Sequence, residues 1–144
     1  MSVWACTWHS FLKKLTVAQN KVFRCMFFMT RFESTQGVLS MYRFLSFTNI
    51  QKYFVLLSIY KSVTQYQGTQ PFRIVTTSHS TRGNNVNVIC PQFRTAAFQN
   101  SLLCSGPQLW NSLPIQIKGL VNNGSLSLFK RSIKSYLFNL ENSS

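Results

Sequence analysis

Aspartate is absent from this chain of 144 residues, and glutamate occurs only twice, as Glu33 and Glu141. Lysine and arginine together number 15, so the formal net charge is +13. A two-metal phosphoryl-transfer site needs several carboxylates, a glycosidase needs a carboxylate pair, and a Ser-His-Asp triad needs its aspartate. The composition argues against these enzyme classes, and we expect no catalytic residue, no metal and no cofactor.

Cysteine spacing and apolar run length exclude further classes. The four cysteines, Cys6, Cys25, Cys90 and Cys104, form no C-x-x-C pair, whereas zinc sites need closely spaced ligands. No secretory signal pattern supports a disulfide framework, so we expect buried free thiols and a protein that is not secreted. The longest apolar run, residues 53–60, is far shorter than the ~18 residues of a membrane span, so no transmembrane segment is expected.

The residues that are present favour a folded protein with a strongly positive surface. Hydrophobic residues make up 45 % of the chain and aromatic residues 15 %, whereas disordered basic tails contain few aromatics. Charged residues account for only 12 %, and nearly all are positive. Such a field favours nucleic acid or an anionic membrane as the partner.

Residues 10–31 have the pattern of an amphipathic helix with Ser10 as its N-cap. One face is apolar and is expected to pack on a core: Phe11, Leu15, Ala18, Val22, Cys25, Met26 and Met29. The opposite arc is wholly basic: Lys13, Lys14, Lys21, Arg24 and Arg31. Because no acidic residue is interleaved to pair with these cations, they form either a solvated face or a contact surface for a polyanion.

Two further segments of the N-terminal part are predicted to be helical. Residues 38–47 form a short apolar piece, and Thr48 and Gln51 then make a capping-box pattern. The helix that they open runs to about Gln65 and is apolar nearly all round, which is typical of a buried helix. We expect it to be the central element of the core.

The middle of the chain, residues 66–107, is punctuated by glycine and proline and is predicted to be a hairpin or loop insert. Runs of β-favouring residues occupy 73–77, 86–90 and 96–104. The last two are expected to pair as a small antiparallel hairpin, with Pro91 in the turn.

The C-terminal part, residues 108–140, is predicted to be helical, with Ser125 capping the last helix and residues 141–144 frayed. The predicted fold is therefore mainly α: helices at both ends and in the centre surround one core, with the small β-hairpin in the middle. Since the length suits one domain, residues 1–144 are expected to form a single unit whose N-terminal helical part is 1–65.

Several strings resemble the C-terminal region of non-LTR retrotransposon reverse transcriptases, in the jockey-like or related groups. The most specific are W-N-S-L-P at residues 110–114 and F-K-R-x-x-K-x-Y-L-F at residues 129–138. The H-S-T-R of residues 79–82 resembles the family's H-x-T-R, and residues 94–95 resemble the R-T that follows it. The V-W-A-C-T-W at the start, then Leu12, Leu15, Gln19, Lys21 and Arg24, are similar to the family's first segment.

The resemblance implies a region downstream of the palm and thumb of the polymerase, without the Y-x-D-D box or the endonuclease. It implies a non-catalytic remnant that grips RNA or DNA, in the nucleus or cytoplasm, with upstream reverse transcriptase domains as further partners. The sequence contains no helix-turn-helix, zinc-finger or RRM signature, so we expect binding that does not depend on nucleotide sequence. The candidate contacts are Lys13, Lys14, Lys21, Arg24, Arg31, Arg82, Arg94, Lys130, Arg131 and Lys134.

Two alternatives stay open from the sequence. In the first, the chain is a translated retroelement relic without a selected function. In the second, it is a basic amphipathic protein that acts at a membrane surface or on another protein. For Trp110 with Asn111 and Pro114, the sequence favours a structural plug and turn over a base-stacking platform.

Overall fold

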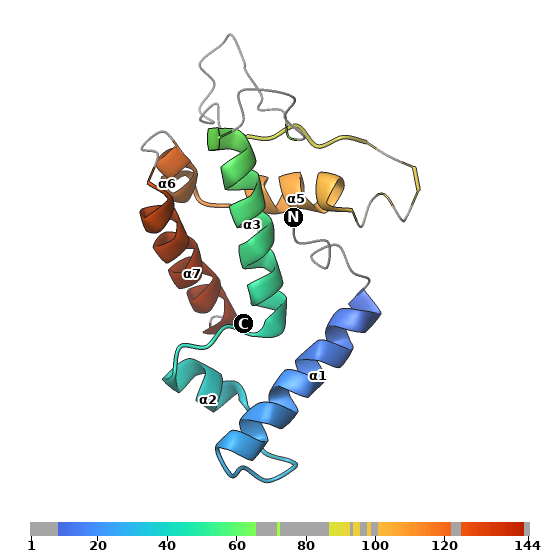
Figure 1. Ribbon diagram of the computed structural model, residues 1–144, viewed down its shortest axis with the longest axis vertical. Coiled ribbons are helices and arrows are strands. Elements are labelled where there is room, and N and C mark those ends of the chain that lie inside the picture. Colours follow the sequence, from blue (N-terminus) through green and yellow to red (C-terminus); the bar gives the residue numbers. More distant parts are fainter. Residues whose placement is uncertain are drawn as a thin grey trace.

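In this computed structural model, α3 (Phe47–Gln65) stands at the centre and contacts α1, α5 and α7 (Figure 1). The other elements are α1 (His9–Met26), α2 (Gln36–Met41), α5 (Leu102–Asn111), α6 (Ile115–Lys118), the 3-10 turn η2 (Gly119–Val121) and α7 (Leu126–Asn142). The structure describes residues 9–65, 72, 87–92, 94, 95, 98, 101–121 and 125–142.

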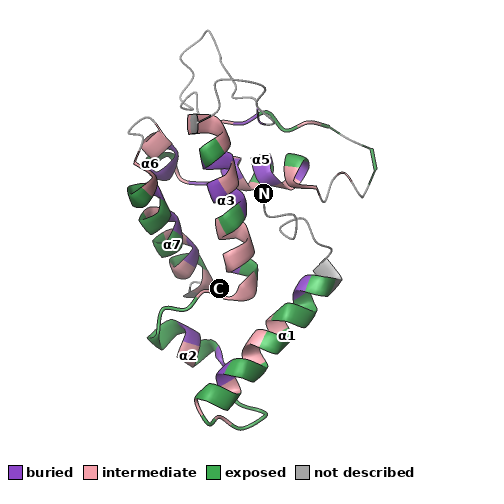
Figure 2. Ribbon diagram, viewed as in Figure 1, coloured by how far each residue is buried: buried purple, intermediate pink, exposed green. Residues whose placement is uncertain are grey.

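The core lies where α3, α5 and α7 meet, and an aromatic group fills it. The ring of Phe129 in α7 stacks on Tyr60 of α3 with ring centroids 4.0 Å apart, and it lies 5.8 Å from the ring of Trp110 in α5. Trp110 is 0 % exposed. Such aromatic pairs stabilise a core beyond the area that they bury. The prediction of a buried central helix is confirmed, and Figure 2 shows the buried positions of α3 facing α5 and α7.

The predicted antiparallel β-hairpin is wrong. Residues 102–104, predicted as part of a strand, form the first turn of α5, and the described parts of the chain contain no strand. Gly106 and Pro107 read as chain breakers in the sequence, yet both are buried inside α5. At Gly106 an added Cβ would lie 3.1 Å from Cδ1 of Ile59, so the glycine permits the close approach of α5 to α3.

Residues 87–90, part of the other predicted strand, form no strand, and the side chain of Asn111 binds both backbone groups of Val88. The Oδ1 atom of Asn111 accepts from the Val88 N–H at 2.9 Å, and its Nδ2 donates to the Val88 carbonyl at 2.9 Å. The Nζ atom of buried Lys118 donates to the Asn111 carbonyl at 2.6 Å and to Oδ1 of Asn87 at 3.0 Å. Burial lowers the pKa of Lys118, and these bonds compensate the buried ammonium.

The first helix packs with a different face from the predicted one. Leu12 and Phe23 are buried, whereas the predicted core positions Phe11, Leu15, Ala18, Val22, Cys25 and Met26 are exposed. The orientation follows from Gln19, whose Oε1 accepts from the Phe47 N–H at 2.7 Å and whose Nε2 donates to the Leu45 carbonyl at 3.1 Å. This polar clamp turns the helix so that its longest apolar stripe faces away from the core.

Both α1 and α2 end earlier than predicted, at residues in the left-handed conformation. Phe28 has φ 51°, and the next amide, of Met29, donates to the Arg24 carbonyl at 2.9 Å. Arg43 has φ 52°, and the amide of Phe44 donates to the Leu39 carbonyl at 2.9 Å. This is the Schellman ending, which usually places glycine where these two bulky residues stand.

The N-terminus of α3 is capped by the preceding Ser46 and by two residues from distant parts of the chain, Gln19 and Glu141. The predicted cap, Thr48, lies inside the helix, and Oγ of Ser46 accepts from the Asn49 N–H at 3.4 Å instead. Oε2 of Glu141 accepts from Nδ2 of Asn49 at 2.8 Å and from the Ser46 N–H at 3.4 Å. Glu141, predicted to lie in a frayed tail, therefore belongs to α7 and places a negative charge at the positive end of α3.

Replacing Asn111 by alanine should lower the free energy of unfolding by about 2 kcal/mol, because the buried Val88 N–H and carbonyl lose both partners. Chemical denaturation measures this loss. Ser112→Ala, which removes one exposed hydroxyl from the same motif, should change stability by less than about 0.5 kcal/mol. Equal effects of the two substitutions would contradict the role of Asn111.

Glu141→Gln should cost about 1 kcal/mol of unfolding free energy, because the first turn of α3 loses a charged acceptor. The matched control is Glu33→Gln, since Glu33 is exposed and its carboxylate accepts from the Thr30 N–H in a surface turn. Thermal unfolding of both variants tests the assignment, and a larger loss for Glu33→Gln would refute it.

Candidate nucleic-acid interface

The outer side of α1 carries three exposed cations, Lys13, Lys14 and Lys21. Arg24 is half-buried, and its Nε donates to the Glu33 carbonyl at 3.2 Å, so it fastens the turn that follows the helix. Arg31 is exposed but lies in that turn, beyond the end of α1. Of the five residues of the predicted basic face, the three lysines are therefore exposed on α1, Arg24 holds a turn, and Arg31 lies outside the helix.

A second set of cations lies on α7. Lys130, Arg131 and Lys134 are exposed, whereas Phe129 and Ile133 of the same helix are buried in the core. In the F-K-R string, the phenylalanine thus packs in the core and the two cations that follow it lie on the surface. The remaining candidates are less informative: Arg94 is exposed on the segment before α5, and Arg82 lies outside the described residues.

Neither carboxylate neutralises these cations. Oε2 of Glu33 accepts from the Thr30 N–H at 3.2 Å, and Glu141 caps α3. Among the residues that the structure describes, no lysine or arginine is paired with either of them. The positive field of α1 and α7 is therefore uncompensated by acidic side chains, as a phosphate-binding surface requires.

A groove with a volume of about 480 Å³ is lined by residues of α1, α3 and α7 and of the segment after α2. Its aromatic lining is Phe23 of α1, Phe44 of the turn after α2, and Tyr53 and Phe54 of α3. Two cations from different elements, Arg43 and Lys134, also line it. The structure thus brings the candidate Lys134 together with Arg43, which the sequence analysis did not single out.

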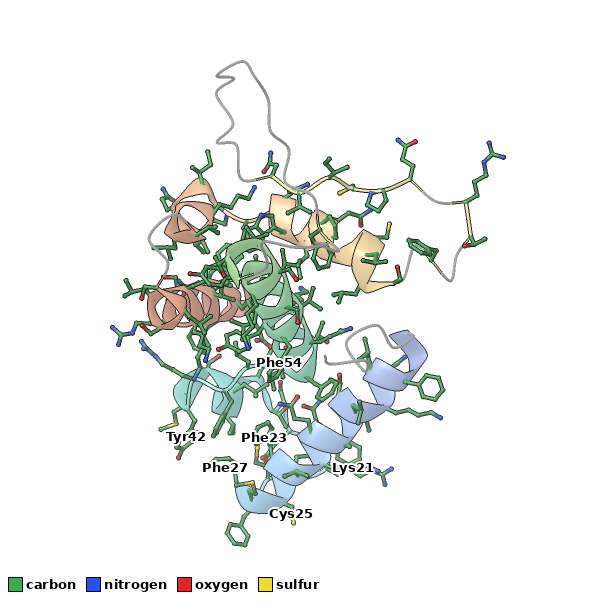
Figure 3. The ribbon with its side chains drawn as sticks, turned by 45° about the horizontal axis from the view of Figure 1, so that its top comes forward. Lys21, Phe23, Cys25, Phe27, Tyr42 and Phe54 are labelled. Atoms are coloured by element: carbon green, nitrogen blue, oxygen red, sulfur yellow. The ribbon has the colours of Figure 1, made fainter. Side chains whose placement is uncertain are left out.

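Stacked rings form one wall of the groove and extend beyond it. Phe23 stacks on Phe44 with centroids 5.3 Å apart, Phe44 lies 6.2 Å from Tyr42, and Tyr42 lies 4.9 Å from Phe27. Figure 3 shows Phe23, Phe27 and Tyr42 together near the lower end of α1, with Lys21 on the other side of that helix. The basic face of α1 and the groove are therefore separate surfaces.

The groove leaves only a weak signal in the sequence. Its residues come from four separate parts of the chain, and no periodic pattern connects them. The local string Y-R-F-L at residues 42–45 interleaves a cation with aromatics, which is a feature of single-strand binders and is the one indication available. Burial raises the pKa of Tyr53, so its phenol is neutral at neutral pH.

The W-N-S-L-P string is structural, as the sequence analysis favoured. Trp110 and Leu113 are buried, Asn111 holds Val88, and Pro114 precedes the first turn of α6. The fully buried Trp110 therefore has no exposed ring face on which a base could stack. The H-S-T-R string of residues 79–82 lies outside the described residues.

The prediction of buried thiols is correct for Cys104 but wrong for Cys25 and Cys90, which are exposed; Cys6 lies outside the described residues. Cys25 is exposed because α1 packs with another face. Within the described ranges no three His, Cys, Asp or Glu side chains form a group that could hold a metal ion. No helix among those residues is long and apolar enough to span a membrane.

Comparison of the chain with protein-family models, with curated proteins and with solved structures finds no match. The resemblance to the C-terminal region of retrotransposon reverse transcriptases therefore stays a hypothesis that depends on the sequence strings alone.

Proposed function

We propose that this protein binds nucleic acid without catalysing a reaction on it and without reading its sequence. The observation that carries the proposal is the set of exposed cations on α1 and α7, in a chain whose two glutamates are both bonded to amide groups. Lys13 and Lys21 on α1, and Lys130 and Arg131 on α7, would contact phosphates. Binding would gain free energy from the release of counterions.

The resemblance to a reverse transcriptase region extends the proposal to a biological setting. The chain would be a remnant of such an enzyme, gripping RNA or DNA through its basic helices, with upstream polymerase domains as further partners. The F-K-R string is compatible with this origin, because its phenylalanine packs in the core while its two cations are exposed and would contact phosphates.

A salt titration with fluorescent single-stranded RNA and with duplex DNA tests the proposal. The logarithm of the binding constant should fall with the logarithm of salt concentration, with a slope of about 0.7 per phosphate contact for single strands and about 0.9 for B-DNA. The double variant Lys13→Gln, Lys21→Gln should reduce the single-strand slope by about 1.4. These two lysines are chosen because Arg24 also tethers a turn.

The matched control is Lys61→Gln, an exposed lysine of α3 outside both basic sets. Its slope should equal that of the unmodified chain. Failure to bind either probe at low salt contradicts the proposal. If the chain also aggregates and unfolds without cooperativity, the better explanation is a translated relic without a selected function.

A second candidate function follows from the unexpected orientation of α1. Its exposed stripe contains Phe11, Leu15, Val22 and Met26, with Lys14 and Lys21 beside it on the helix. Such a helix can lie in the interface of an anionic membrane, with the apolar stripe in the acyl region and the lysines at the head groups.

Co-sedimentation with vesicles separates this second candidate from the first. A membrane-surface protein should bind phosphatidylserine-containing vesicles and not neutral ones, and Phe11→Asn with Val22→Asn should abolish that binding. Ile115→Asn, an equally exposed apolar residue on α6, is the control that should leave it unchanged. Absence of binding to anionic vesicles rules the second candidate out.

A further inference from the structure

We propose that the groove between α1 and α3 accepts an unpaired nucleobase of a single strand, with neighbouring phosphates on Arg43 and Lys134. The inference depends on the proposed nucleic-acid binding and adds to it the place where the strand is held and the form of nucleic acid that fits. It concerns a surface distinct from the basic face of α1.

The walls of the groove have the chemistry that a base requires. Phe44 is 41 % exposed and Phe54 is 37 % exposed, and both line the groove. Phe23 is buried against Phe44 and supports its ring, with centroids 5.3 Å apart. Bases stack on such rings regardless of their identity, since every base has an aromatic face.

The size of the groove also fits this occupant. Its volume of about 480 Å³ lies in the range of small-ligand pockets, roughly 300–1,000 Å³, which suits a nucleotide unit rather than a protein helix. The groove is open to solvent and not enclosed, so a strand could enter without threading.

The two cations select an anionic occupant. Arg43 comes from the turn after α2 and Lys134 from α7, so the groove is flanked by positive charge contributed by separate elements. Neither Glu33 nor Glu141 lines it. A planar aromatic ligand with attached negative charge matches both features, and a nucleotide has this combination.

The backbone at Arg43 supports a role for its side chain. The residue has φ 52°, a conformation that glycine adopts at no steric cost, and its guanidinium carbon lies 5.9 Å from the centroid of the Phe138 ring. The ring holds the cation at the groove while the planar group can still contact a phosphate.

The occupant must come from a single strand. In a duplex the bases are stacked on their neighbours and paired, so their faces cannot reach side chains in a groove. The surface cations of α1 and α7 would contact duplex and single strand alike through phosphates. The groove therefore adds a preference for unpaired nucleic acid to binding that is otherwise electrostatic.

Two DNA strands of equal length test the proposal: a deoxyadenosine strand and a strand whose sugars carry no bases. Both have the same phosphates. The unmodified chain should bind the base-bearing strand about tenfold more tightly, which corresponds to the stacking of roughly one base. The double variant Phe44→Leu, Phe54→Leu keeps apolar volume but loses the rings, so it should bind both strands equally.

The abasic strand also serves as the folding control. Its affinity and its salt slope should be the same for the double variant and the unmodified chain, because phosphate contacts are intact. Phe32→Leu, an exposed phenylalanine that does not line the groove, should retain the tenfold preference. Retention of the preference in the double variant overturns the proposal, since the bases would then be bound elsewhere.

The remaining outcomes are equally decisive. Equal affinity of the unmodified chain for both strands overturns the groove proposal and leaves phosphate binding standing, whereas binding to neither strand contradicts the proposed function itself. Anionic vesicles complete the test: if Phe44→Leu with Phe54→Leu weakens vesicle binding and not strand binding, the groove is a lipid site and the base-binding proposal is wrong.

Discussion

The first turn of α3 fixes the arrangement of the helices, because its amide groups are satisfied by side chains from distant parts of the chain. Gln19 accepts from the Phe47 N–H and thereby sets the rotation of α1, while Glu141 reaches the same turn from the end of α7. Free amides at a helix start are costly to bury without partners. Satisfying them places α1 and α7 on either side of α3 and creates the groove that Phe23 and Lys134 line.

Because acidic residues are so few, the interactions of the two glutamates decide how much of the positive charge is neutralised. Of the two glutamates, one caps the central helix and the other caps a turn, so the cations of the described residues repel one another without relief from ion pairs. This repulsion opposes compaction, and the aromatic core around Phe129 has to offset it. A polyanion that bound α1 and α7 would remove the same repulsion, so binding and folding would support each other.

Periodicity predicted the elements whose apolar residues face one continuous core. The central helix and the helix after Ser125 are of this kind, and the surface positions of Lys13, Lys130 and Lys134 follow from the same pattern. It failed for α1 because the hydrogen bonds of Gln19 turn a different face of the helix toward the core. A hydrogen bond to a residue 28 positions away produces no periodic pattern in the sequence. Periodicity failed at residues 102–104 because a short apolar run suits strand and helix alike, and the burial of Gly106 and Pro107 inside α5 depends on α3. The groove escaped prediction because its walls are assembled only by the fold.

The left-handed backbone at Arg43 bears on the history of the chain. Glycine would end α2 at less conformational cost, so drift in a chain that no longer functions would readily accept it at this position. Selection for a charge at the groove would instead keep arginine there against the preference of the backbone, together with the phenylalanine that follows it. Tolerance of glycine at position 43 would thus distinguish the alternative of a relic without a selected function from the proposed binding protein.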